Sequence, residues 1–508
     1  MEDSRRGVGA DGAGTRVGVR GRWVWTLLAG LLLLAGAVVL VTASGDVRRE
    51  SALAGSVPVR VVSPPDDARA PALVLSHGFA GSAAMMDPMA SALARAGYVV
   101  LLPDLPGHGS NADPLAEGVL EPAVGAAVAL AAERTGGAVA VAGHSMGAGA
   151  VTAWAAGEGS ATTAATIAIS LPSAEDLPAD PARPPNLLLL WGSAEQQRFV
   201  DAALDALALG HPDALPGATY GSAADGTARR AVEIAGAEHI AVVYRDQSAR
   251  EIAAWLGGGS PRGDARWIGL VLVLVGGVVL ARPLLVDPVA GAAGSAGRVG
   301  EGAGGAGPWR AVGWLGACTA LAGLGAALLQ GILEAVPVAV AGYLIGWFAC
   351  GALVLVVAAG RVGSPAGTRL GLARGALAGA ALAASLALPA RLTWAEFALV
   401  GPRPWVLSLL LGVLGAWFWG EAGMLHGIDR WRRAAVLACS RVLVVAGLLA
   451  AVVLLDAPGF LTLTVPLVIP ILGLLAVIAW WARDPAAAAS AQAIPLALAI
   501  AATFPIVA

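Results

Sequence analysis

The sequence contains no lysine, and this absence removes two large classes of enzyme. P-loop nucleotide hydrolases need a lysine to reach the bound phosphates, and Schiff-base enzymes need a lysine amine to form the imine. Common metal-binding motifs are also lacking: the chain has no His-Glu-x-x-His motif and no Cys/His set with zinc spacing. The sequence therefore predicts neither a metal nor an organic cofactor.

Cysteine and charge are scarce as well. The three cysteines, Cys318, Cys350 and Cys439, all fall in apolar runs, so no disulfide is expected. Charged residues make up 13% of the chain and the net charge is −3, with scattered arginines, which gives nucleic-acid binding no support. A Gly-x-Gly-x-x-Gly match at residues 300–305 lies in a glycine-alanine linker and indicates low complexity, not a dinucleotide site.

Long apolar runs are what the chain has in abundance. Hydrophobic residues make up 57% of the 508 residues, which is more than soluble proteins carry. The first run predicts a transmembrane anchor at 23–43 after a cytoplasmic tail at 1–22, and about eight further helices predict a membrane domain over 266–508. These further runs are 267–286, 311–330, 337–360, 375–390, 404–424, 434–455, 459–482 and 491–508.

The arginines predict the orientation in the membrane. With a cytoplasmic N-terminus, the inner loops carry most of the arginines of the membrane domain, and the outer loops carry only Arg391 and Arg403. This asymmetry satisfies the positive-inside rule and predicts that residues 55–258 lie outside the cytoplasm. The Ala- and Gly-rich composition without lysine suggests a bacterial source. Residues 41–43 would also suit a signal-peptide cleavage site, but the long apolar run favours an uncleaved anchor, and either form exports the domain.

The most informative stretch reads Gly-His-Ser-Met-Gly over residues 143–147. It follows the apolar run 138–142, which is typical of a buried strand, and precedes the small-residue run 148–156, which suits a helix. A serine is a poor nucleophile unless a sharp strand-to-helix turn presents it to a histidine and to helix-start amides. The pattern predicts a nucleophile elbow at Ser145.

Four other apolar runs have strand character, and a motif follows each of them. The turn His-Gly-Phe at 77–79 is where an oxyanion hole is expected. The runs and their motifs are 72–76 before 77–79, 98–102 before the loop 103–110, 186–190 before Trp-Gly-Ser-Ala-Glu at 191–195, and 231–234 before Gly-Ala-Glu-His at 236–239.

With these motifs in the order nucleophile, acid, histidine, residues 55–258 resemble an α/β-hydrolase-fold serine enzyme of the esterase and lipase kind. The resemblance implies a mostly parallel sheet with helices on both faces. It implies that Ser145 is the nucleophile, His239 the general base and Glu195 the carboxylate that orients the imidazole. The backbone amides of Phe79 and Met146 would form the oxyanion hole.

The acid has two alternatives. This family more often has aspartate after the strand, so Asp201, or Asp176 after the preceding strand, could take the place of Glu195. The remaining polar residues near the motifs receive structural interpretations: packing under the elbow for His144, shaping of their loop for Asp104 and His108, and a surface position for His211.

The sequence thus predicts a membrane-tethered serine hydrolase that cleaves esters or thioesters of a small-molecule or lipid acyl substrate through an acyl-enzyme. Acyl transfer to an acceptor held by the membrane domain would use the same residues. A hydrolase-like domain that only binds, and a transporter with an accessory outer domain, are the rival classes. The complete triad argues against the first, and the scarcity of polar residues in the spans argues against the second. The oligomeric state stays open.

The sequence also predicts how exposed the active site is and which charges pair within the membrane domain. Few residues separate the strand at 163–170 from the strand at 186, so no helical cap is expected and the site should be open or lightly covered. Residues 196–227 would supply at most a partial lid. In the membrane domain, Glu421 and Arg441 fall at similar depths on successive antiparallel helices, which predicts a buried ion pair. The alternative is that Arg441 snorkels to the inner interface.

Overall fold

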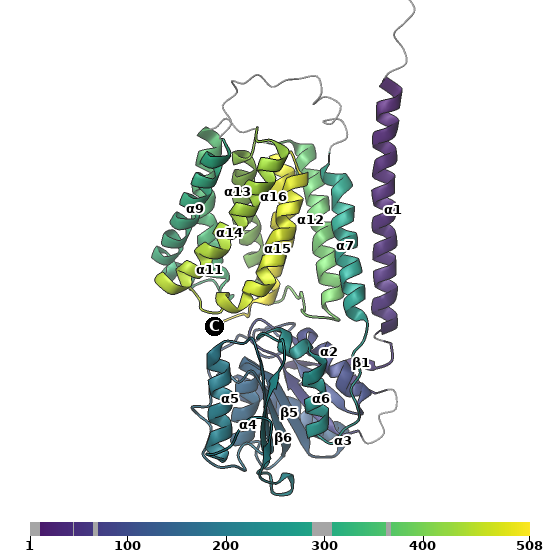
Figure 1. The fold of residues 1–508 in the computed structure, drawn as a ribbon, viewed down its shortest axis with the longest axis vertical. Helices are drawn as coiled ribbons and strands as arrows, with labels where there is room; N and C mark the ends of the chain where they lie inside the picture. Colours follow the sequence, from purple (N-terminus) through teal and green to yellow (C-terminus); the bar gives the residue numbers. More distant parts are fainter. Residues whose placement is uncertain (1–10, 44, 65–69, 287–306, 362–366) are drawn as a thin grey trace, which may run out of the picture.

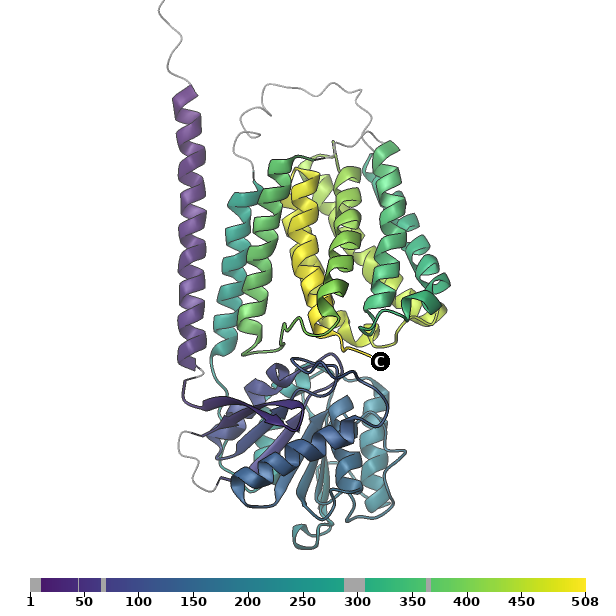
Figure 2. The same cartoon turned by 180° about the vertical axis from the view of Figure 1, so that it is seen from behind.

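The structure is a computed structural model that describes residues 11–43, 45–64, 70–286, 307–361 and 367–508. It consists of an α/β part and a bundle of long helices (Figure 1). The bundle lies against one end of the α/β part, and the C-terminus lies at the junction of the two. Figure 2 shows the same arrangement from behind, with helix α1 (Asp11–Ala43) running along the side of the bundle. The glycine match at 300–305 lies outside the described residues.

The α/β part is built on one nine-stranded sheet with the order β1-β2-β4-β3-β5-β6-β7-β9-β8. Strands β4, β3, β5, β6, β7 and β9 are parallel, and the antiparallel strands β1, β2 and β8 lie at the edges. The strands are β1 (Arg48–Ala54), β2 (Val57–Ser63), β3 (Ala72–Ser76), β4 (Val99–Pro103), β5 (Val139–His144), β6 (Thr163–Ile169), β7 (Leu187–Gly192), β8 (Thr219–Tyr220) and β9 (Arg229–Ile234).

Helices cover both faces of this sheet, which is why the central strands are continuous apolar runs without polar alternation. Helices α2 (Ala83–Arg95) and α6 (Asp246–Trp255) pack on one face. On the other face lie α3 (Leu120–Thr135), α4 (Met146–Ala156) and α5 (Gln197–Gly210). The fold class predicted from the motifs is confirmed, and the bounds of the predicted strands differ from the observed ones by at most two residues.

Nine helices in the described part of the chain are long and apolar enough to cross a membrane, as predicted. They include α1, whose span covers residues 21–43, and eight helices of the bundle. These eight are α7 (Arg266–Leu285), α9 (Pro308–Leu328), α11 (Ala341–Arg361), α12 (Arg369–Ala390), α13 (Arg403–Met424), α14 (Arg430–Leu454), α15 (Leu461–Trp481) and α16 (Pro485–Thr503). The short helix α10 (Gln330–Leu333) follows α9.

Two predicted spans have the wrong bounds, for identifiable reasons. Helix α12 starts at Arg369, not at residue 375, because the hydroxyl of Thr368 accepts a hydrogen bond from Gly371 N (2.8 Å) and caps the helix. Arginines fit in the first turns of a membrane-spanning helix because their long side chains can reach the interface. Helix α16 runs over Pro485–Thr503, not over 491–508. The carboxylate of Asp484 caps its start, and the chain after it leaves the helix to pair with other segments.

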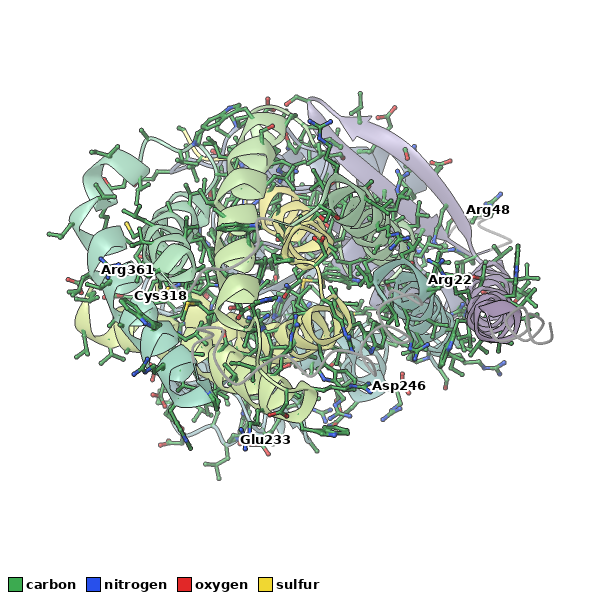
Figure 3. The ribbon with its side chains drawn as sticks, turned by 90° about the horizontal axis from the view of Figure 1, so that it is seen from above. Arg22, Arg48, Glu233, Asp246, Cys318 and Arg361 are labelled. Atoms are coloured by element: carbon green, nitrogen blue, oxygen red, sulfur yellow. The ribbon has the colours of Figure 1, made fainter. Side chains whose placement is uncertain are left out.

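The bundle has its own core, with Trp347, Trp417 and Phe418 fully buried at its centre. Helix α1 packs against α7 at the edge of the bundle, where Gly36 and Gly269 let the two backbones approach closely. In the view along the helices, Arg22 on α1 lies on the opposite side from Cys318 and Arg361 (Figure 3).

A buried cluster of charges joins the α/β part to α7. Asp87 on α2 accepts hydrogen bonds from Arg49 at 2.9 Å, Arg60 at 3.2 Å and Arg266 at 2.5 Å, and the side chains of Asp87 and Arg266 are fully buried. Burial opposes ionisation of Asp87, but the hydrogen bond and charge of Arg49 and the charges of Arg266 and Arg60 outweigh it and lower its pKa. The α/β part is thus fixed to the bundle by paired charges.

A second junction lies at the start of α13. Arg403, which the sequence pattern assigns to an outer loop, is the first residue of α13 and is completely buried. Its guanidinium donates to the carbonyls of Gly109 (2.6 Å), Gly107 (3.0 Å) and Phe504 (3.3 Å), because burial leaves these carbonyls no water to bind. Close by, Ile506 accepts a hydrogen bond from Leu115 N and donates one to Gly107 O, each at 2.8 Å.

Candidate active site

Ser145 occupies the sharp turn between β5 and α4. Its backbone has φ 52° and ψ −118°, a conformation that non-glycine residues rarely adopt. The flanking glycines make the turn sterically feasible: a Cβ on Gly143 would lie 2.2 Å from Gly147 O, and one on Gly147 would lie 2.4 Å from His77 O. The Gly-His-Ser-Met-Gly motif thus forms a strained turn that holds the serine hydroxyl at the end of a central strand.

The structure brings Ser145, His239 and Glu195 together. The Nε2 atom of His239 lies 3.1 Å from the hydroxyl of Ser145, and its Nδ1 contacts a carboxylate oxygen of Glu195. The other carboxylate oxygen of Glu195 accepts hydrogen bonds from the hydroxyl of Ser170 (3.0 Å) and the amide of Gly192 (2.9 Å). A carboxylate held this way fixes the imidazole with Nδ1 protonated and Nε2 free to accept the serine proton.

Two neighbours further hold His239 in place. The ring of Phe199, the third residue of α5, stacks on the imidazole with centroids 4.2 Å apart. His144 donates from Nε2 to the backbone carbonyl of His239 at 2.8 Å. Burial, assisted by the charge of His239, lowers the pKa of His144 to about 3, so this ring is neutral and acts as a hydrogen-bond donor. His144 therefore packs under the elbow, as predicted.

Met146 and Phe79, whose amides are predicted to form the oxyanion hole, follow Ser145 and Gly78 in the chain. Met146 is the first residue of α4, so its N–H has no partner within the helix. The loop before Phe79 touches the elbow, since a Cβ on Gly78 would lie 3.2 Å from the Cβ of Ser145. Within the described residues, neither amide has a hydrogen-bond acceptor, and an alkoxide on a carbon bound to Ser145 would supply one.

The alternative acids lie elsewhere. Asp201 is exposed on α5, where it accepts a hydrogen bond from Gln197 at 2.9 Å, and Asp176 is exposed in the loop after β6. The geometry therefore favours Glu195. Sequence reasoning missed Ser170, whose only signal is its place at the carboxyl end of β6, where side chains of parallel strands converge.

The other polar residues have structural surroundings. Asp104 accepts hydrogen bonds from the amides of Ala83 (2.7 Å) and Ser110 (2.9 Å), which shapes its loop. Burial, together with the charge of His77, lowers the pKa of His108 well below its usual value, so its ring is also neutral. His211 was predicted at the surface but is half-buried against Tyr220, with centroids 5.6 Å apart.

The helical bundle covers this site, which corrects the prediction of an open or lightly covered site with a partial lid from residues 196–227. Residues 196–227 form α5, β8 and a short 3-10 turn, and α5 packs on β7 and β9 as part of the sheet layer. The cover comes from the bundle: a cavity of about 230 Å³ is lined by Ser145 and His239 together with residues of α11, α14, α15 and α16. Phe79 contacts Phe460, just before α15, with ring centroids 4.8 Å apart.

No cluster of three or more histidine, cysteine or acidic side chains that could hold a metal ion occurs in the part of the chain that the structure describes. A larger hollow of about 610 Å³ lies beside β1 and α3, lined by Arg48, Glu50 and Arg134, and includes none of the residues of the triad.

The comparisons with known proteins concern the α/β part of the chain. Residues 71–189 match the family described as alpha/beta hydrolase fold. No curated protein sequence is significantly similar to this chain. Among solved structures, a predicted hydrolase from Thermoplasma acidophilum is 18% identical, covers 41% of this chain and 97% of its own, and has a TM-score of 0.33.

Two other solved structures are similar to the same degree. A bacterial membrane phospholipase A is 15% identical, with 48% of this chain and 96% of its own covered and a TM-score of 0.33. A dienelactone hydrolase from Anabaena variabilis is 18% identical, with 42% and 98% covered and a TM-score of 0.32. The strand order, the elbow and the family match together show that this chain carries an α/β-hydrolase fold joined to a bundle of membrane-type helices.

Proposed function

We propose that this protein is a membrane-tethered serine hydrolase that cleaves carboxylic esters or thioesters. The observation that carries the proposal is the hydrogen-bonded series Ser145–His239–Glu195, which stands at the carboxyl ends of β5, β9 and β7. A fold alone does not define a reaction, but a nucleophile, a base and an orienting acid in this geometry support acyl transfer through serine.

The reaction would proceed in two steps. The Ser145 hydroxyl attacks the carbonyl carbon while its proton passes to Nε2 of His239, and the amides of Phe79 and Met146 stabilise the oxyanion. Collapse of the tetrahedral intermediate breaks the bond to the leaving group, which takes the proton from His239. Water then attacks the acyl-enzyme while Nε2 of His239 takes one of its protons. Collapse of the second tetrahedral intermediate breaks the bond between the acyl carbon and the Ser145 oxygen, and His239 returns the proton to that oxygen, which releases the acid and restores the hydroxyl.

We further propose that the hydrolase domain faces outward from the cytoplasmic membrane. The helix ends remote from the hydrolase domain carry most of the arginines of the described spans: Arg22, Arg282, Arg310, Arg361, Arg369, Arg374, Arg430, Arg432, Arg433 and Arg483. The ends next to the hydrolase domain carry Arg266, Arg391 and Arg403. Positively charged loops favour the cytoplasmic side, so this distribution supports an outward-facing active site.

Labelling with a fluorophosphonate probe tests the reaction class. We expect the full-length protein in detergent to react, with the mass increase on the peptide that contains Ser145, and the Ser145→Ala variant not to react. A native protein that stays unlabelled would indicate a domain that binds without turnover.

A further inference from the structure

The cavity that contains Ser145 continues from the hydrolase domain into the helical bundle. Ser145, His144 and His239 line it on one side. On the other side it is bounded by four helices, with Phe348 on α11, Val444 and Leu448 on α14, Val468 on α15 and Leu496 on α16 among the lining residues. The nucleophile thus opens into a space whose walls are membrane-type helices.

The bundle side of this cavity has almost nothing to offer a polar ligand. Its hydroxyl groups include those of Thr464 and Thr503, and each donates to a carbonyl of its own helix, Leu461 O at 2.8 Å and Ala499 O at 2.7 Å. Hydroxyls bonded in this way are largely satisfied. The remaining wall is aliphatic and aromatic, which suits a hydrocarbon chain and does not suit a sugar, a peptide backbone or an ion.

The cavity also reaches the outer surface of the bundle. Leu467 lines it and yet is 41% exposed, and Ile469, two residues further along α15, is 55% exposed and does not line it. In a membrane-spanning helix, such exposed leucine and isoleucine side chains face lipid. One end of the cavity therefore lies at the nucleophile, and its wall at α15 borders the hydrocarbon of the bilayer.

We infer that the bundle holds the acyl chain of the substrate, and that the substrate class is a long-chain acyl ester drawn from the bilayer. This inference rests on the proposed function, because it assigns the chain of the ester whose carbonyl meets Ser145. The carbonyl lies between Ser145 and the amides of Phe79 and Met146, and the chain extends between α14, α15 and α16.

The energetics of this site differ from those of a water-facing lipase pocket. A chain that moves from lipid into the cavity exchanges one apolar environment for another, so the transfer itself contributes little free energy. The cavity contributes by holding the ester carbonyl within reach of the nucleophile. This positioning raises kcat/KM for long-chain esters. A short ester has no chain that reaches the bundle, so its turnover depends on the hydrolase domain alone.

Matched substitutions test this inference in the full-length protein in mixed micelles. Ala499→Phe places a ring in the cavity from α16, and Ala446→Phe places the same ring on an exposed position of α14 that does not line the cavity. A second pair on α15 compares Val468→Phe, in the cavity, with Ile469→Phe, on the lipid-facing side. Hydrolysis of p-nitrophenyl acetate and p-nitrophenyl palmitate is measured for each, after titration of active enzyme with a short fluorophosphonate.

We expect both cavity variants to lower kcat/KM for the palmitate ester by about 10- to 100-fold, with acetate turnover and active-site titre close to those of the native protein. Both lipid-facing variants should retain both activities. Equal effects of all four substitutions on palmitate, or no effect of any, would overturn the acyl-chain site while leaving serine hydrolysis intact. Loss of the proposed function itself would show differently, as acetate turnover that does not depend on Ser145.

Discussion

Arg441 on α14 forms two hydrogen bonds with Glu421 on α13, from Nη1 to Oε1 at 2.7 Å and from Nη2 to Oε2 at 3.0 Å. The two side chains are 8% and 1% exposed, so the alternative that Arg441 snorkels to the interface is wrong. Ser440 donates to Glu421 Oε1 at 2.5 Å, and Arg441 donates to Gln492 on α16 at 2.8 Å. The predicted pair therefore joins three helices, two of which border the cavity.

Removal of one partner of this pair should destabilise the bundle. Glu421→Gln and Arg441→Gln each leave a charge buried without its counter-ion, which typically costs about 3–5 kcal/mol in soluble proteins. We expect a lower Tm in detergent for each variant and a partial recovery in the double variant. Arg432→Gln, at a 71% exposed position paired with Asp429, is the control and should leave the Tm nearly unchanged. Additive losses in the double variant would mean that the two residues do not interact energetically.

The triad should behave as one unit. Ser145→Ala and His239→Ala should each lower kcat for a short ester by about 10⁴-fold or more, and the double variant should lose little beyond either single change. Glu195→Gln should cost less, because the amide keeps part of the hydrogen bonding. Asp201→Asn, at an exposed position where the carboxylate accepts from Gln197, serves as the control, and a larger loss there than at Glu195 would reassign the acid. Circular dichroism should show an intact fold throughout.

The sequence was sufficient to predict that Ser145, His239 and Glu195 lie together, and to predict the long apolar helices, because these signals are local. Each strand of the sheet is a short apolar run, and the residues that meet around Ser145 follow directly after β3, β5, β7 and β9 in the order of a known fold. The ion pair of Glu421 and Arg441 could be predicted because two charges in long apolar runs need partners, and the helix rise gives their depth.

The junction of the two parts could not be predicted, because its contacts join distant segments. Ile506 pairs with Gly107, and Arg403 donates to that same glycine carbonyl, yet no local pattern near any of these residues marks a partner. The cover over Ser145 could not be predicted for the same reason. Leu496 and Val468 have the composition of ordinary membrane helices, and only the packing shows that they line the cavity of the nucleophile.

Acid should destabilise the protein partly through His144. Its folded-state pKa of about 3 lies below the ordinary value of 6.5, so as pH falls below about 6.5 the unfolded chain binds a proton that the folded chain does not. The free energy of unfolding should fall by about 2 kcal/mol between pH 7 and pH 5 from this residue alone. His144→Gln, which can still donate to His239 O, should lose less Tm over that range than the native protein does.

The matched control is His426→Gln, at an exposed position between α13 and α14. Its Tm should decline with acid as steeply as that of the native protein. An unchanged decline in His144→Gln would show that His144 does not stay neutral in the folded protein.

The charges around Asp87 should matter for stability. Asp87→Asn leaves Arg266, whose side chain is fully buried, with Asp264 as its remaining carboxylate at 2.6 Å. We expect a clear fall in Tm, since a buried arginine loses part of its compensation. Asp46→Asn removes a carboxylate that is 57% exposed and paired with Arg95, and it should cost less than about 1 kcal/mol. Equal effects of the two substitutions would mean that the Asp87 cluster contributes no more than a surface ion pair.

Cysteine accessibility should report the orientation in the membrane. In a background with Cys318, Cys350 and Cys439 changed to alanine, Ala218→Cys places a thiol on an exposed loop of the hydrolase domain, and His426→Cys places one at the opposite end of the bundle. If arginine-rich ends face the cytoplasm, an impermeant maleimide should label the cysteine at 218 in intact cells and the one at 426 only after the cells are permeabilised. The reverse pattern would place Ser145 in the cytoplasm and make the inner leaflet the source of its acyl substrate.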